Sequence, residues 1–199
     1  MKTIPPTTSK MIPMFICWKF RGWHLFYQAY PPEDPRQHWG HAISENLINW
    51  KDLPYAIYPN PEEKCFSGAT LVQKDRVIAM YHGTNAGNMI ATSSDPLLLN
   101  WEKLTGQPVI NLNPEGAPPE LRVFDPCIWE KGEYYYSLSG GTLPHTPSGR
   151  RIRANFLFKS AIYGGEINLK IWFNYFNKLF CISTIALFYF LPFLFSKLS

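Results

Sequence analysis

Few side chains of this sequence stand where they could do chemistry. Asp125 precedes Pro126 at the start of an expected strand, and a carboxylate fixed there by the stiff proline can accept hydrogen bonds from hydroxyl groups. His38 and His41 are three residues apart, a spacing that places them on opposite faces of a strand and argues against a metal site. None of the four cysteines belongs to a CxxC pair, so the sequence carries neither a zinc-ribbon nor a dithiol redox pattern.

A unit that recurs about every 54 residues indicates the elements that must position these side chains. Its copies occupy 18–27, 72–81 and 129–138, and each combines an apolar residue, a polar turn and an aromatic or β-branched run that ends in or near tyrosine. A second phrase, ending in tryptophan, is shared by 42–50 and 91–101. A period of this length, built of strands and turns, is typical of β-propeller blades. A propeller would bring the innermost strands of its blades, and a ligand site, to a central axis.

Composition favours an all-β chain without a nucleic-acid partner. Aromatic residues are 16% of the 199 residues, which suits β-structure, and 18 prolines argue against long helices. The net charge of +4 comes without a basic run, so no nucleic-acid footprint is present. Residues 1–10 are polar and proline-rich; we expect them to be disordered, and they lack the apolar segment of a secretory signal peptide. The sequence does not indicate a compartment.

The blade pattern stops near Ser160. The last expected strands lie at 126–130, 133–139 and 154–159. Residues 161–199 are expected to form an apolar tail, in which 179–196 carry no charge and approach the length of a membrane-spanning helix. Three interpretations stay open for it: a C-terminal membrane anchor, a buried pair of apolar strands, or a tail unrelated to the domain, for example from a truncated or misread gene. The third is favoured because the blade pattern ends abruptly and nothing replaces it.

Five phrases, taken in order, carry a resemblance to a known family. They lie at 23–28 (WHLFYQ), 38–50 (HWGHAIS followed by Trp50), 53–59 (LPYAIYP), 65–69 (CFSGA) and 124–126 (FDP). In this order and spacing they resemble the five-bladed propeller of glycoside hydrolase family 32, the β-fructosidases, over residues 11–160. The resemblance implies an all-β fold with about three of five blades, and an ancestral hydrolysis of terminal fructosides without a metal or organic cofactor.

The resemblance also implies catalytic carboxylates, most of which are missing. Family members hydrolyse with retention, so one carboxylate attacks the anomeric carbon and another protonates the leaving oxygen. An ungapped count places the nucleophile on Ile12, which cannot attack carbon, and the Glu-Cys pair of the acid/base does not occur. The third carboxylate, a transition-state stabiliser in an Arg-Asp-Pro motif, matches Asp125. The arginine of that motif is Phe124 here, which removes a charged donor from the sugar site.

Further positions match sugar-contacting residues of the family. Gln28 ends the first strand of the motif series, and Phe66 and Ser67 match a substrate-contacting pair. Trp39 matches a tryptophan of the sugar pocket, where an indole face packs on a sugar ring. Trp50 and Trp101 repeat in register with the blades, so we assign them to core packing.

We therefore expect a glycosidase of the β-fructosidase type that is weak or inactive as it stands, because two of three carboxylates are unaccounted for. The alternative is a non-catalytic carbohydrate-binding fragment that keeps Gln28, Trp39, Ser67 and Asp125 as a sugar-contacting surface. A third possibility is a fragment without a function of its own, whose exposed strand edges invite aggregation. The expected partner is a fructoside-like oligo- or polysaccharide, and a membrane partner is possible through residues 179–196.

Overall fold

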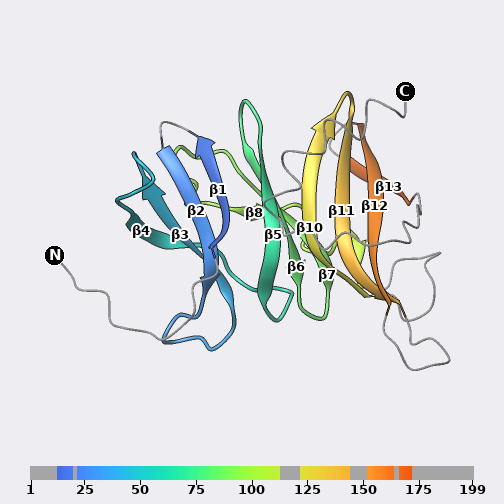
Figure 1. Ribbon diagram of the computed structural model, residues 1–199, viewed down its shortest axis with the longest axis horizontal. Coiled ribbons are helices and arrows are strands. Elements are labelled where there is room, and N and C mark those ends of the chain that lie inside the picture. The colour runs from blue at the N-terminus through green and yellow to red at the C-terminus, as the bar shows by residue number, and fades with distance from the viewer. Residues whose placement is uncertain (1–12, 20–21, 113–121, 144–151, 164–165, 172–199) are drawn as a thin grey trace.

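The computed structural model describes residues 13–19, 22–112, 122–143, 152–163 and 166–171. In these ranges the regular structure consists of β-strands in three antiparallel sheets that lie side by side (Figure 1). No helix within the described ranges is long and apolar enough to cross a membrane. The segments predicted to be disordered (1–10) and to associate with a membrane (179–196) lie outside these ranges.

Each sheet contains four antiparallel strands in chain order, and the second has a fifth strand as well. The first contains β1 (Pro13–Lys19), β2 (Gly22–Ala29), β3 (His38–Ser44) and β4 (Lys51–Ile57). The second contains β5 (Cys65–Val72), β6 (Val77–Gly83), β7 (Gly87–Ser93) and β8 (Glu102–Lys103), and β9 (Ile110–Asn111) also pairs with β7. The third contains β10 (Arg122–Lys131), β11 (Tyr134–Leu143), β12 (Ile152–Tyr163) and β13 (Glu166–Ile171).

The predicted repeat is confirmed as a blade of a propeller. Its three copies fall on the hairpins β1–β2, β5–β6 and β10–β11, which are the first two strands of each sheet. The first strands pack together, because β5 lies against β1 on one side and against β10 on the other (Figure 1). The three sheets are therefore blades whose innermost strands β1, β5 and β10 line a common axis.

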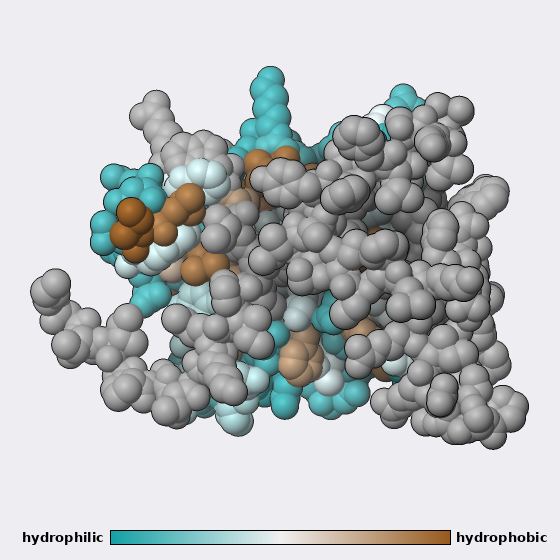
Figure 2. All heavy atoms as spheres, in the orientation of Figure 1, coloured by the Kyte–Doolittle hydropathy of each residue, from teal (hydrophilic) through white to brown (hydrophobic). Residues whose placement is uncertain are grey.

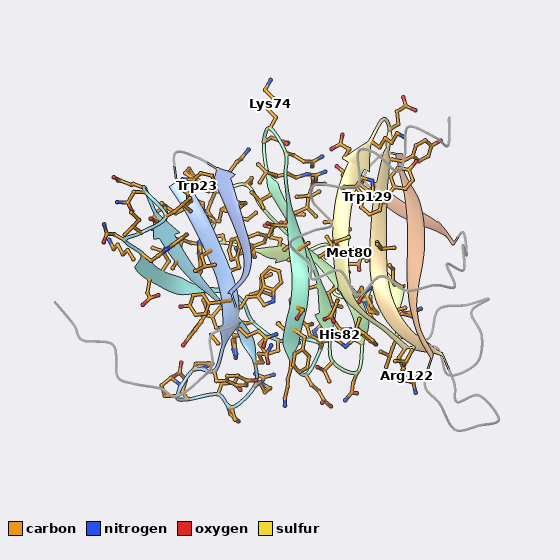
Figure 3. All side chains as sticks on the ribbon, in the orientation of Figure 1. Trp23, Lys74, Met80, His82, Arg122 and Trp129 are labelled. Carbon is orange, nitrogen blue, oxygen red and sulfur yellow. The ribbon has the colours of Figure 1, made fainter. Side chains whose placement is uncertain are left out.

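Apolar side chains fill the two spaces between neighbouring blades. In β6, Val77 and Tyr81 point into a cluster shared with the first blade, whereas Ile78 and Met80 point into a cluster shared with the third. Figure 3 shows Met80 on the side of β6 that faces the third blade. This alternation follows from the period of two along a strand, and it explains why β6 reads as a continuous apolar run.

The second repeated phrase forms the same turn after β3 and after β7. In each turn an Asn or Asp side chain accepts backbone hydrogen bonds, a leucine has a positive φ, and a tryptophan indole donates to the carbonyl of that leucine. The residues are Asn46, Leu47 (φ 63°) and Trp50 in the first blade, and Asp95, Leu98 (φ 53°) and Trp101 in the second. A leucine with a positive φ is uncommon, so its recurrence indicates that both blades are built to one plan.

Strand pairing in the third blade continues past Ser160, where the sequence analysis places the end of the domain. β12 extends to Tyr163, and β13 pairs with it from Tyr163 opposite Glu166 to Phe158 opposite Ile171. The predicted boundary at Ser160 thus falls inside β12. Residues 172–199, the larger part of the predicted tail, lie outside the described ranges.

Among the described residues, which carry colour in Figure 2, exposed hydrophobic side chains gather in small groups. Figure 2 shows the most prominent group at the left end of the molecule, over the first blade. The most exposed large hydrophobic residue of the described chain is Ile48, in the turn between β3 and β4, at 80%. Single exposed residues of this kind are normal on a soluble surface and carry no functional argument.

Candidate functional site

Each innermost strand contains one extra residue near its start. The pairing of β5 with β6 shifts between Cys65 and Gly68, so that Phe66 and Ser67 together face His82. The pairing of β1 with β2 shifts in the same way between Pro13 and Phe15. Such β-bulges bend a strand and redirect its side chains, and they are frequent beside binding sites. The bulges mark one end of the three inner strands as the candidate site.

The bulge of β10 contains the predicted carboxylate. Pairing with β11 shifts between Phe124 and Cys127, so that Asp125 and Pro126 together face Ser139. Asp125 is exposed and has a φ of 47°, although a residue before proline normally prefers an extended backbone. A backbone held in such a conformation costs on the order of 1–3 kcal/mol and is typical of functional sites. The bulge therefore presents the Asp125 carboxylate to solvent at the inner edge of the third blade.

Two further predicted residues meet across the first two blades. The Gln28 side chain, near the end of β2, donates from Nε2 to Ser67 Oγ over 3.4 Å. Both side chains are partly exposed. Because β2 and β5 belong to different blades, this hydrogen bond joins the blades at the site itself. An amide and a hydroxyl placed together offer donors and acceptors to a polyhydroxylated ligand.

Trp39 supports the site from behind. Its indole is fully buried and packs with Phe26 and Tyr81, and Nε1 donates to the carbonyl of Phe66 over 2.8 Å. The observed role of this side chain is thus to hold the start of β5, where Phe66 and Ser67 stand. Direct packing of Trp39 on a sugar ring stays a prediction.

The Phe124 side chain packs over the backbone of β11 and offers no polar group to a ligand. Its half-buried ring lies over Gly140 of β11, where an added Cβ would be 3.2 Å from the ring. The position that should contribute a charged donor, according to the family resemblance, thus contributes an apolar surface beside Asp125.

His82 is a site residue that the sequence analysis missed. It faces the bulge of β5, and its ring stacks on Phe66 with the ring centroids 6.3 Å apart and an interplanar angle of 24°. Burial lowers the pKa of His82, whereas the Asn88 side chain and the Asp125 carboxylate act to raise it. Figure 3 shows His82 at the end of the blades where Arg122 begins β10, and Lys74 at the opposite end. The sequence feature that could have identified His82 is its position as the polar residue directly after Tyr81, which ends the second copy of the repeat.

Glu62 is a buried carboxylate near the start of β5, but its hydrogen bonds commit it to structure. It accepts from Tyr81 Oη over 2.7 Å, from Lys103 Nζ over 2.6 Å and from Cys65 Sγ over 3.3 Å. Burial by itself raises the pKa of Glu62, but the bonds from Lys103 and Tyr81 outweigh burial, and the pKa is lowered. Glu62 is therefore an ionised anchor that ties the segment before β5 to the second blade, and it is not free to act as an acid.

The remaining candidates have other neighbours. His38 contacts the carbonyl of Arg36 and the carboxylate of Asp34, whereas His41 lies 2.9 Å from His24, from Nε2 to Nδ1. Within the described part of the chain, no group of three or more His, Cys, Asp or Glu residues could hold a metal ion. Ile12, at the position matched to the nucleophile, lies outside the described ranges.

Comparison with known proteins gives a consistent match. The model of the glycosyl hydrolases family 32 N-terminal domain matches residues 15–148. The chain is similar to a levanase of Bacillus subtilis, with 36% identity over 104 residues, which are 44% of this chain and 15% of the levanase. It is also similar to a sucrose-6-phosphate hydrolase of Escherichia coli, with 30% identity over 157 residues, 70% of this chain and 31% of that protein. It thus spans less than a third of the length of either relative.

Solved structures resemble the three blades in the same way. A Bombyx mori GH32 β-fructofuranosidase matches with a TM-score of 0.61 and 30% identity, covering 75% of this chain and 32% of that chain. A fructan 1-exohydrolase IIa variant from Cichorium intybus in complex with 1-kestose matches with a TM-score of 0.68 and 26% identity, covering 87% of this chain and 33% of that chain. The blades correspond to about a third of each of these chains.

Proposed function

The chain belongs to glycosyl hydrolase family 32, as the match over residues 15–148 shows, and from this premise we propose that its blades form part of a fructoside site of the β-fructosidase type. Relatives named levanase and sucrose-6-phosphate hydrolase support a fructoside as the ligand class. Similar solved enzymes are complexes with sucrose and with 1-kestose, which supports a ligand of di- or oligosaccharide size.

The observation that carries the proposal is the hydrogen bond between Gln28 and Ser67 beside the bulge of β5. These two side chains can exchange their mutual bond for bonds to sugar hydroxyls. The exposed carboxylate of Asp125 adds an acceptor on the third blade, and the half-buried ring of Phe66 adds an aromatic surface for the C–H face of a sugar.

Hydrolysis with retention needs two more groups than this site supplies. Asp125 can accept hydrogen bonds from fructosyl hydroxyls and stabilise positive charge that develops at the anomeric carbon. It cannot serve as nucleophile and acid/base as well, and Ile12 stands at the nucleophile position. We therefore propose that the chain binds fructosides and hydrolyses them slowly or not at all, having lost most of an enhancement that in enzymes is about 10⁶-fold or greater.

Calorimetric titration with sucrose, 1-kestose and inulin, together with an assay of released fructose, tests the proposal. We expect saturable binding with little turnover, and roughly tenfold weaker binding in Asp125→Asn and Ser67→Ala, the loss of about one good hydrogen bond each. Asp75→Asn is the matched control, because Asp75 is exposed in the β5–β6 turn, next to Lys74 at the opposite end of the blades (Figure 3). Absence of binding to all three saccharides would overturn the site, and rapid turnover abolished by Asp125→Ala would overturn the predicted loss of hydrolysis.

Membrane association through residues 179–196 stays a separate prediction that draws on the sequence alone. If it holds, the protein should need detergent to remain in solution, and deletion of 179–196 should remove that need. A full-length protein that stays in solution without detergent would contradict it.

A further inference from the structure

We propose that His82, the cross-strand neighbour of Asn88, is a positioning residue of this site that fixes the ring of Phe66 and faces the carboxylate of Asp125. The importance of the position rests on the proposed fructoside site, whereas the coupling between His82 and Asp125 can be measured without any sugar. Three features of the described chain lead to this inference. They are the register of the strands, the buried polar side chains of Asn88 and Ser139, and the carboxylate of Asp125.

The register gives His82 and Ser139 equivalent places in two blades. Each is the single residue that faces the two residues of a bulge, His82 behind Phe66 and Ser67 in the second blade, and Ser139 behind Asp125 and Pro126 in the third. A side chain in this place contacts the back of the bulge and can determine how its residues point.

A buried polar path connects these two places. Asn88 of β7 is the cross-strand neighbour of His82, and its Nδ2 donates to Ser139 Oγ over 2.8 Å. Both Asn88 and Ser139 are fully buried. Asn88 therefore lies beside the residue that faces the bulge with Ser67 and is hydrogen-bonded to the residue that faces the bulge with Asp125.

The orientation of the His82 ring follows from the donors and acceptors on this path. Asn88 Nδ2 donates one of its two hydrogens to Ser139, whereas Asn88 Oδ1 accepts no hydrogen bond within the described ranges. His82 Nδ1 and Asn88 Oδ1 are both buried, and neither atom forms a hydrogen bond in the described ranges. A proton on Nδ1 that reached Oδ1 would satisfy both atoms, and Nε2 would then be the unprotonated nitrogen of a neutral ring.

The charges around His82 differ from one neighbouring strand to the next. β5 contributes the uncharged ring of Phe66 and β7 the amide of Asn88, whereas β10 contributes the Asp125 carboxylate, whose field acts on the imidazole. Glu62, which packs near Gly83, is already paired with Lys103. Because β10 packs against β6, the proposal includes an electrostatic coupling between His82 and Asp125 across the boundary between the second and third blades.

The test follows the imidazole signals of the full chain by NMR as a function of pH, with the His82 signal assigned by its loss in His82→Phe. We expect Asp125→Asn to lower the titration midpoint of His82 by roughly half a pH unit. Asp95→Asn is the matched control: Asp95 acts on His24 and His41, and the equivalent turn of the first blade already uses Asn46. A His82 midpoint that is the same in wild type, Asp125→Asn and Asp95→Asn would overturn the inference.

A second measurement separates positioning from mere packing. We expect His82→Phe to weaken binding of 1-kestose at least tenfold, and His82→Gln, which keeps a donor for Asn88, to recover part of that affinity. Equal affinity of wild type and His82→Phe would overturn the positioning role. If the wild type binds no fructoside, the proposed function fails, and the NMR titration still decides whether His82 and Asp125 are coupled.

Discussion

The indole of Trp39, in the first blade, donates its hydrogen to the carbonyl of Phe66, in the second blade, over 2.8 Å. The donor is fully buried, and the acceptor is the first of the two bulge residues of β5. A core side chain of one blade therefore controls the backbone of a site residue in the next. The hydrogen bond that stabilises the interface between the first two blades therefore also determines the geometry of the site.

The first prediction follows from that bond. Trp39→Phe keeps an aromatic ring in the core but leaves the Phe66 carbonyl without its donor, so we expect a loss of about 2–3 kcal/mol in the free energy of unfolding, measured with urea. Trp50→Phe is the control, because its indole donates to Leu47 in an exposed turn, and the expected loss is below about 1 kcal/mol. Equal losses in the two variants would contradict the role assigned to Trp39.

The second prediction concerns acid sensitivity. Burial, and then the neighbouring His24, lower the pKa of His41 to about 3, although Asp95 opposes them. The unfolded chain takes up this proton below pH 6.5, the ordinary value, whereas the folded chain does so only near pH 3. The contribution to stability is therefore fully present above pH 6.5 and is lost as the pH falls towards 3.

His41→Gln isolates this effect, because glutamine does not titrate. Between pH 7.5 and pH 4, we expect the free energy of unfolding of the wild type to fall by about 3 kcal/mol more than that of the variant. The carboxylates titrate equally in both proteins and cancel in the comparison. If the free energy of unfolding, measured with urea, falls by the same amount in the two proteins across this pH range, His41 is not held neutral by the fold.

The third prediction concerns the ion pair between the buried Glu62 and the partly exposed Lys103, whose charged atoms are 2.6 Å apart. Lys103→Met leaves a buried carboxylate without its partner, so we expect a loss of about 3 kcal/mol at pH 7. The variant should hold Glu62 protonated, with a raised pKa, so its stability deficit should shrink as the pH falls. The double variant Glu62→Gln, Lys103→Met should recover most of the loss, and a double variant no more stable than Lys103→Met would argue against the pair as the cause.

The sequence predicts the blades well because each repeats a hairpin and a turn whose chemistry is local. Asn46 and Asp95 accept the bonds of equivalent turns, and the tryptophans that follow them recur in register. The bulges could not be predicted, because a shift in the pairing of two strands leaves the pattern of residue types along each strand unchanged. The strand expected at 126–130 in fact begins at Arg122, because an Asp before a Pro suggests a break where the chain makes a bulge.

The candidate site is predicted in part for a related reason. Motif resemblance identifies Gln28, Ser67 and Asp125 one by one, and the structure brings Gln28 and Ser67 into contact. His82 is missed because its importance arises from packing, which stacks its ring on Phe66 of β5 and brings β10 of the next blade against β6. No local pattern in the sequence describes that approach.

The last prediction concerns Phe124, which covers Gly140 beside the exposed carboxylate of Asp125. In Phe124→Arg the aliphatic stem can cover the same backbone while the guanidinium adds a charged donor at the site. A charge-assisted hydrogen bond contributes about 1.5–3 kcal/mol, so we expect fructoside binding at least tenfold tighter by calorimetry. The new cation should also lower the NMR titration midpoint of His82, because like charges disfavour protonation.

Phe124→Leu is the matched control for this gain, because it removes the aromatic ring and adds no donor. We expect its affinity for 1-kestose to equal that of the wild type within a factor of about three, while only the arginine variant binds more tightly. A leucine variant that gains as much as the arginine variant would show that the Phe124 ring merely obstructs the site. The missing charge would then not be what limits sugar binding.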